Sequence, residues 1–424
     1  MRFVTRLLKP EEDIAYEKVQ AVAFEKEYDE SVKEEAKTSV ISRKIGVFHE
    51  DGKTWMGCLQ INDYRCRYDG NEVSLGGIGG VATLPQYRHN GVIRSAMQFA
   101  LQDMYEKGQT FSYLYPFSTQ YYRKFGFEPG SVLQEWTIPL KDLPQQKMNG
   151  TVEQIFPGDS TKELLDIYEK FYQEYNLSSI RNVYSEELER ENLLKQKRYV
   201  FLYRNEQGEA TGFFIMNKEQ SEKGIMMQCV PSFRNYNDFL FLDSDAISGM
   251  FSFIKQAFGA YYDFLKIALP DNVCISSLVG ENNTAECRLF HEGMVRVVNV
   301  ENALSLCKCK GSGSVCIEIQ DNMISKNHGR WKVCFEERTQ TKVERTDDEP
   351  DISLPINDFS TLICGARSMD DIRYMPNVVI YRNHMELEKI FYRKKCHMTE
   401  LYEKFVCVHL EKELKFMDFI VEFF

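Results

Sequence analysis

The segment Gly76–Met97, "GGIGGVATLPQYRHNGVIRSAM", changes its period half-way and therefore decides the fold. Its first part reads as a strand that Pro85 ends. After Gly91, apolar residues recur at helical spacing and predict one buried helix face, formed by Ile93, Ala96, Met97, Ala100, Leu101 and Met104. A strand, a short loop and an amphipathic helix in this order indicate a mixed α/β domain.

The glycines of this segment fit neither of two common phosphate-binding loops. A dinucleotide-binding turn needs G-x-G-x-x-G between strand and helix, but Gly77, Gly79 and Gly80 are followed by more strand. A P-loop ends in Gly-Lys-Ser/Thr, which is missing. The loop of residues 88–93 instead joins the strand to the helix, where exposed N–H groups attract an anion. Gly91 would let a phosphate approach the backbone closely.

Composition sets the broad class of the chain. Its 424 residues, with 43% hydrophobic and 27% charged residues, predict a soluble protein of two to four domains. No run of 18 apolar residues and no secretory signal is present, so we expect no membrane span, a cytoplasmic location and free cysteine thiols. The net charge of −11 argues against nucleic acid as a partner.

The order of predicted elements divides the chain into three units. Helix over residues 11–48, a strand meander, and alternating strands and helices fill residues 1–145. A polar linker follows, and residues 150–298 repeat that order without sequence identity. Residues 299–424 form a third unit that starts with a hairpin and ends in the Phe-rich tail "LKFMDFIVEFF".

Two motifs in the first unit resemble those of GCN5-related N-acetyltransferases (GNATs). Arg88–Ile93 is similar to the acetyl-CoA signature R-x-x-G-x-G/A, with Ile93 in place of the last small residue. Leu114–Glu128, "LYPFSTQYYRKFGFE", is similar to the "fYrkfGFe" motif of these enzymes. With the order of the units and the tail, the chain resembles the enhanced intracellular survival (Eis) family. The fold implied is α/β (α+β), with tandem GNAT-like mixed-sheet domains, the second degenerate, before a sterol-carrier-protein-like domain.

The resemblance implies acetyl-CoA as the cosubstrate and no metal ion. Its pyrophosphate would bind the loop before the helix, and its pantetheine would lie along the preceding strand. The implied cofactor-binding residues are Val81, Ala82, Thr83, Arg88, His89, Asn90, Gly91, Val92, Ile93 and Ser118. The second unit carries no R-x-x-G-x-G/A motif, so we expect it not to bind coenzyme A.

Acetyl transfer to an amine needs a proton acceptor, an oxyanion donor and a group that stabilises the leaving thiolate. The resemblance implies Tyr122 as general acid, with the adjacent Tyr121 as an alternative; a free phenol has a pKa near 10, not far from that of a thiol. A backbone N–H near residues 80–81 would hold the oxyanion. The implied base is the C-terminal carboxylate of Phe424, whose pKa neighbouring apolar rings would raise; Glu422 is a rival carboxylate.

The acceptor site is expected at the end of the first helix, and its candidate residues are Phe24, Glu25, Glu27 and Tyr28. The resemblance implies cationic amine substrates such as aminoglycosides, acetylated at several positions, and a homo-oligomer, namely a hexamer. A protein-lysine acetyltransferase is one alternative. A non-catalytic lipid- or ligand-binding protein that uses the third unit is another.

Overall fold

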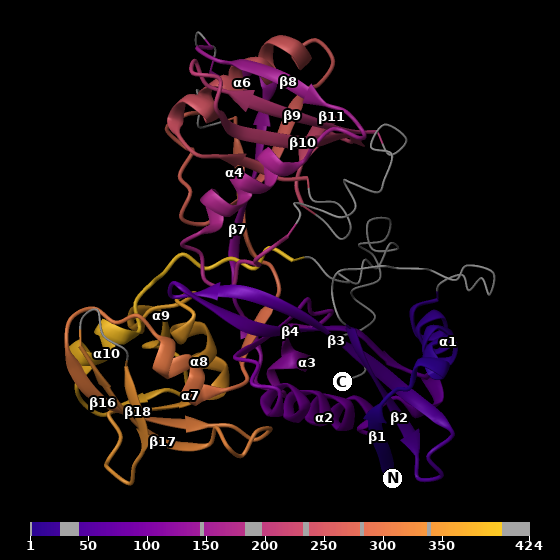
Figure 1. Cartoon of the computed structure of the whole chain (residues 1–424), viewed down its shortest axis with the longest axis vertical. Helices are drawn as coiled ribbons and strands as arrows, with labels where there is room; N and C mark the ends of the chain where they lie inside the picture. The colour runs from indigo at the N-terminus through magenta and orange to yellow at the C-terminus, as the bar shows by residue number, and fades with distance from the viewer. Residues whose placement is uncertain are drawn as a thin grey trace.

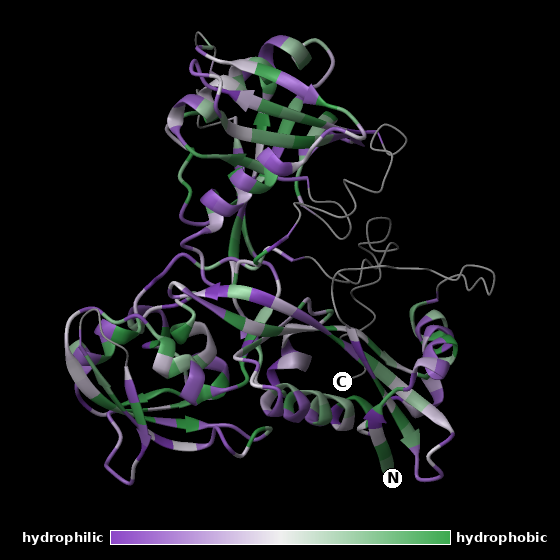
Figure 2. Ribbon diagram, in the orientation of Figure 1, coloured by the Kyte–Doolittle hydropathy of each residue, from purple (hydrophilic) through white to green (hydrophobic). Residues whose placement is uncertain are grey.

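The computed structural model describes residues 2–25, 42–144, 148–182, 197–231, 237–279, 284–336 and 341–400. These residues form three mixed α/β units, each built around one sheet (Figure 1). The predicted α/β (α+β) class is therefore confirmed. Figure 2 shows that hydrophobic residues concentrate on the inner strands of the sheets, as burial between layers requires.

The first sheet has the order β1-β2-β3-β4-β5-β15-β6. Its strands are β1 (Phe3–Leu7), β2 (Ser42–His49), β3 (Trp55–Tyr68), β4 (Asn71–Thr83), β5 (Phe111–Leu114), β15 (Met294–Val297) and β6 (Glu128–Pro129). Asp69 and Gly70 both have positive φ and form the tight turn between β3 and β4. The prediction of helix over 11–48 is wrong for residues 42–48, where β-branched and aromatic residues pair as β2 with its neighbours.

Helices cover both faces of this sheet. Its helical segments are η1 (Pro10–Glu12), α1 (Asp13–Phe24), η2 (Pro85–Tyr87), α2 (Val92–Glu106) and α3 (Thr119–Arg123). All six apolar residues predicted for one face of α2 are buried, so the period inferred after Gly91 is confirmed. Successive residues of β3 point to opposite faces of the sheet, and each face carries its own helix. A Cβ added at Gly57 would meet Val92 of α2, whereas Cys58 packs with Tyr16 of α1.

The second sheet has the order β14-β7-β13-β11-β10-β9-β8, with β12 beside β10. Its strands are β7 (Val132–Pro139), β8 (Thr151–Ile155), β9 (Arg198–Arg204), β10 (Ala210–Ser221), β11 (Gly224–Cys229), β12 (Phe239–Phe241), β13 (Phe264–Pro270) and β14 (Glu286–His291). Its helical segments are η3 (Leu140–Asp142), α4 (Lys162–Tyr172) and α6 (Ser244–Phe258). Helix α6 has 15 residues, as has α2 in the first unit.

The third sheet has the order β18-β17-β16-β19-β20. Its strands are β16 (Gly313–Gln320), β17 (Gly329–Phe335), β18 (Lys342–Arg345), β19 (Ile352–Pro355) and β20 (Val379–Ile380). Its helices are α7 (Val300–Leu306), α8 (Ile356–Ile363), α9 (Met369–Ile372) and α10 (His384–Ile390). Strands β16 and β17 pair as the hairpin that the sequence predicts for this unit.

Two strands cross the borders predicted for the units. Strand β7 lies within residues 1–145 but pairs with β13 and β14 of the second sheet. Strand β15 lies within residues 150–298 but is inserted between β5 and β6 of the first sheet. The division at 145, 150–298 and 299–424 stays a prediction of domain limits, and the sheets themselves exchange strands across it.

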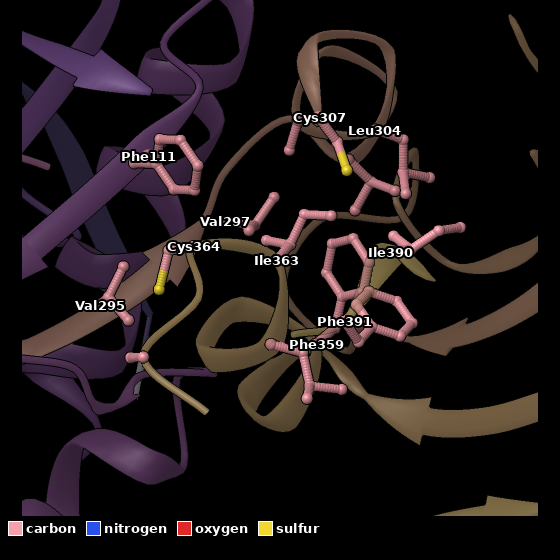
Figure 3. Packing of buried hydrophobic residues seen from close by; sticks show 14 of the residues in the cluster. Phe111, Val295, Val297, Leu304, Cys307, Phe359, Ile363, Cys364, Ile390 and Phe391 are labelled. Atoms are coloured by element: carbon pink, nitrogen blue, oxygen red, sulfur yellow. The ribbon is translucent and has the colours of Figure 1, made fainter. Parts of the chain in front are cut away.

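The first and third units share one hydrophobic core (Figure 3). Phe111 and Val295 of the first sheet belong to the same buried cluster as Phe359 of α8. Beside this cluster, the fully buried Arg296 forms an ion pair with Asp321 and donates a hydrogen bond to the carbonyl oxygen of Phe125. The third unit therefore braces the loop that follows α3.

Candidate functional site

Strand β5 ends before the neighbouring strand β4 does. Their parallel ladder joins only Leu75–Ile78 to Phe111–Leu114, whereas β4 continues beside β3 as far as Thr83. In the described residues, positions 79–83 of β4 therefore have no strand partner on the side of β5. An opening at the carboxyl ends of parallel strands is a typical place for a ligand.

A β-bulge lies in this part of β4. Cys58 pairs with Ala82 but Gln60 pairs with Gly79, so β4 has one extra residue there. Gly80 has a φ of +58°, and an added Cβ would collide with the Tyr16 hydroxyl. Both the backbone conformation and the space beside Tyr16 thus require a glycine at position 80.

The start of α2 is open to an anion. Gly91 is its N-cap, with a φ of +84° and no side-chain cap, and its carbonyl oxygen accepts the first helical bond from Ser95. The N–H groups that follow Gly91 have no partner within the helix. They point out of its N-terminus, which is the end of the helix dipole that attracts negative charge. Arg88 and His89 are exposed just before this turn, and His89 itself has a φ of +65°.

The ten predicted cofactor-binding residues differ in what they expose. Arg88, His89, Asn90 and Gly91 are exposed, whereas the side chains of Val92, Ile93 and Ala82 are buried, and those of Val81 and Thr83 are half-buried. The buried ones could contact a ligand only through their backbone. Ser118 caps α3 by accepting a hydrogen bond from the Tyr121 N–H (3.3 Å).

Tyr122 lies in the core next to the opening. It is 1% exposed and belongs to the same hydrophobic cluster as Ile78 and Leu114, the last pair of the β4–β5 ladder. Phe117 and Tyr121 contact its ring, with ring centroids 5.5 and 5.3 Å away. Burial raises the pKa of the Tyr122 phenol well above its usual value, and burial also raises the pKa of Tyr121.

This pKa changes the chemistry expected of the phenol. A free tyrosine is already protonated at neutral pH, and the raised pKa of Tyr122 extends this hydrogen-bond-donor form to more alkaline pH. It also widens the gap between the pKa of the phenol and that of a thiol, which the sequence-based argument placed close together. Such a phenol can donate a hydrogen bond but gives up its proton less readily than a free phenol.

Only two of the four predicted acceptor-site residues lie in the described part of the chain. Phe24 is partly buried against the cluster that joins α1 to β3 and β4, and Glu25 ends α1 as an exposed residue with a φ of +54°. Glu27 and Tyr28 lie outside the described residues, as do Glu422 and Phe424.

Sequence reasoning missed the polar groups that α1 brings to the β4 bulge. The Tyr16 hydroxyl donates to Gln60 Oε1 (3.1 Å), and Gln20 Nε2 donates to the Gly80 carbonyl oxygen (2.5 Å). One signal could have revealed these groups. Gln20 is a polar residue on the same buried face of α1 as Tyr16 and Val19, where an apolar residue is expected.

Neither the thiols nor the acidic residues that the structure describes suggest another site. Cys307 and Cys309 have sulfur atoms 3.7 Å apart, and the described cysteines are free thiols. Over the described ranges, no group of three His, Cys, Asp or Glu residues could hold a metal ion. None of the described helices combines the length and the apolar character needed to cross a membrane.

Two family models match the chain. Residues 5–130 match the acetyltransferase (GNAT) domain, and residues 300–396 match the sterol carrier protein domain. The chain therefore contains a GNAT acetyltransferase domain and a sterol-carrier-protein-like domain, and it is an N-acetyltransferase. Enzymes of the GNAT fold use acetyl-CoA and act on amines. No curated protein matches the sequence.

Solved structures share the fold over nearly the whole chain. A probable N-acyltransferase from Enterococcus faecalis superposes with a TM-score of 0.81 at 18% identity, and a GCN5-related N-acetyltransferase from Anabaena variabilis with 0.79 at 18%. Eis1 from Mycobacterium abscessus superposes with 0.75 at 16%. Each alignment covers 95% of this chain and 100% of the other. At these identities the likeness shows the arrangement of units alone.

Proposed function

We propose that this N-acetyltransferase moves the acetyl group of acetyl-CoA directly to amines of cationic substrates such as aminoglycosides, at more than one position, as an enzyme of the Eis type. The observation that carries the proposal is the opening beside residues 79–83 of β4, which leads to the uncapped start of α2 at Gly91. The acidic net charge of −11 agrees in sign with a cationic acceptor.

The cofactor would follow this opening. Its pyrophosphate would bind the N–H groups at the start of α2, assisted by Arg88, and its pantetheine would lie along Val81–Thr83. Ser118 would border the thioester from the loop before α3. This placement would put the thioester where the ladder between β4 and β5 ends, beside Tyr122.

The proposed reaction forms a C–N bond, breaks the C–S bond and removes one proton from the amine. The amine nitrogen attacks the thioester carbon, and the oxygen that becomes negative accepts a hydrogen bond from the N–H of Val81. The C=O bond then re-forms as the C–S bond breaks, and the sulfur leaves as a thiolate that accepts a hydrogen bond from the Tyr122 hydroxyl. The proton that the amine loses goes to the terminal carboxylate of Phe424.

A thiol-release assay with acetyl-CoA tests the proposal directly. The acceptors would be an aminoglycoside, a lysine-containing peptide and a neutral primary amine at equal concentration. We expect the aminoglycoside to give the highest kcat/KM and more than one acetyl group per molecule by mass spectrometry. Preference for the peptide would favour a protein-lysine acetyltransferase. Coenzyme A binding without turnover of any amine would contradict the proposed function and favour a ligand-binding role.

The role of the terminal carboxylate has its own test. Extending the chain by a few residues after Phe424 removes that carboxylate from its position, so turnover should be lost while coenzyme A binding remains. Full activity of the extended protein would show that another group takes the proton. Sedimentation of the same samples would test the hexamer.

A further inference from the structure

Gln20 in α1 carries an amide whose contacts point to a role beyond packing. We propose that Gln20 is a positioning residue for acetyl transfer, because it orients the Gly80–Val81 peptide so that the Val81 N–H faces the opening beside β5. The inference rests on the proposed function. Gln20 is 5% exposed and lies one helical turn after Tyr16.

The orientation of the Gln20 amide is set by its neighbours. Its Nε2 donates to the Gly80 carbonyl oxygen (2.5 Å) and to Cys58 Sγ (3.2 Å). The reversed orientation would place two oxygen atoms in contact, which is repulsive. The Gly80 carbonyl is therefore directed toward α1, out of the ladder between β3 and β4.

A planar trans peptide then fixes the next N–H. The described residues contain no cis peptide, so the carbonyl of Gly80 and the N–H of Val81 point in opposite directions. The Val81 N–H faces away from α1, at a level where the pairing of β4 with β5 has already ended at Ile78. This is where the proposed reaction needs a donor for the oxyanion.

The other end of the amide is a second sign of function. Gln20 Oε1 is buried and has no hydrogen-bond partner in the described structure. Buried acceptors are almost always satisfied, and a leucine of similar size would fill the same space without an unpaired oxygen. A glutamine here is explained if its Nε2 is needed to hold the bulge.

Substitution to leucine separates positioning from packing. In Gln20→Leu, kcat should fall about 10- to 100-fold. This decrease should not exceed the decrease that follows the removal of a direct oxyanion donor. The Kd for coenzyme A and the KM for acetyl-CoA should stay within about twofold. Gln98→Leu is the matched control, because Gln98 is an exposed glutamine of α2 and its loss should leave kcat unchanged.

The variant Gln20→Glu supplies a readout that a packing role would not move. A protonated carboxyl can donate to the Gly80 carbonyl, whereas a carboxylate repels it, and burial raises the pKa of the new carboxyl. The ratio of its kcat to that of the wild type should therefore rise as pH falls from about 9 to about 6. A ratio that does not change with pH would overturn the inference.

The outcomes distinguish this inference from the function on which it rests. If the wild type turns over no amine, the proposed function fails. If the wild type is active and Gln20→Leu keeps its kcat, only the positioning role fails. If Gln20→Leu instead loses coenzyme A binding together with its fold by circular dichroism, Gln20 is structural and the inference is overturned.

Discussion

The first and second sheets share a pattern of five strands, β1-β2-β3-β4-β5 and β8-β9-β10-β11-β13, whose last two strands are parallel. They differ at each point where a cofactor would bind. In the first, β4 continues to Thr83, five residues beyond its last partner in β5. In the second, β11 ends at Cys229, which is also its last residue paired with β13. In the described part of the second sheet, β11 therefore has no stretch beyond its ladder with β13 along which pantetheine could lie.

The two 15-residue helices also start differently. Helix α2 starts after Gly91, which offers no side-chain cap, so its first N–H groups are free to meet a pyrophosphate. Helix α6 starts after Asp243, whose carboxylate accepts a hydrogen bond from the Ala246 N–H (2.8 Å). A negative charge thus already occupies the place that an anion would take. Similar folds can keep or lose a ligand through one residue at a helix end.

The third difference lies in the segment after the fifth strand, which is β5 in the first sheet and β13 in the second. After β5 the first unit places α3 and the buried Tyr122 beside the opening. After β13, residues 271–285 contain no tyrosine. We therefore propose that the first unit, which matches the GNAT domain, binds coenzyme A and carries the chemistry.

The largest effect is expected for Tyr122→Phe. Removing the hydroxyl deletes the donor to the leaving sulfur, so kcat should fall about 100-fold or more, with KM for acetyl-CoA nearly unchanged. The control is Tyr121→Phe, which should retain most of the activity. Equal losses in both variants would contradict the assignment to Tyr122.

The pH dependence of the wild type follows from the same group. The pKa of Tyr122 is raised, so the neutral donor form persists at alkaline pH and is lost only as pH rises through that raised pKa. We therefore expect no fall in kcat from tyrosine ionisation between pH 7 and about 10. A loss centred near pH 9 would show that another group is the donor.

The next effect is expected for Gly91→Asp, which places a carboxylate at the start of α2, as Asp243 does at the start of α6. The new carboxylate would compete for the helix N–H groups and repel the pyrophosphate, so the Kd for coenzyme A should rise about 100-fold. Calorimetry measures this directly. Gly108→Asp is the matched control, because Gly108 has a similar φ of +71° with open space at the other end of α2; weakened binding there would point to strain as the cause.

The smallest effect is expected for Asp243→Ala. Losing the cap of α6 should destabilise the second unit by about 1 kcal/mol, which lowers its thermal midpoint by about 2–4 °C. Thermal unfolding followed by circular dichroism measures the shift. Coenzyme A binding should not change, and a second binding event in this variant would show that the cap alone had closed the site.

Local sequence patterns predicted much of this architecture. The apolar face of α2, the turn at Asp69–Gly70 and the cap at Ser118 were readable because each depends on residues close in the chain. The insertion of β15 between β5 and β6 was not readable, since that pairing joins segments about 180 residues apart. Nothing in a single helix indicates which distant carbonyl Gln20 will meet.

The number of coenzyme A molecules bound per chain is the measurement that tests the central claim most directly. Isothermal titration of the full-length protein should give one site per chain, and that site should bind about 100-fold more weakly in Gly91→Asp and be unchanged in Asp243→Ala. Two sites per chain, or one site that survives Gly91→Asp unchanged, would contradict the assignment of cofactor binding to the first unit.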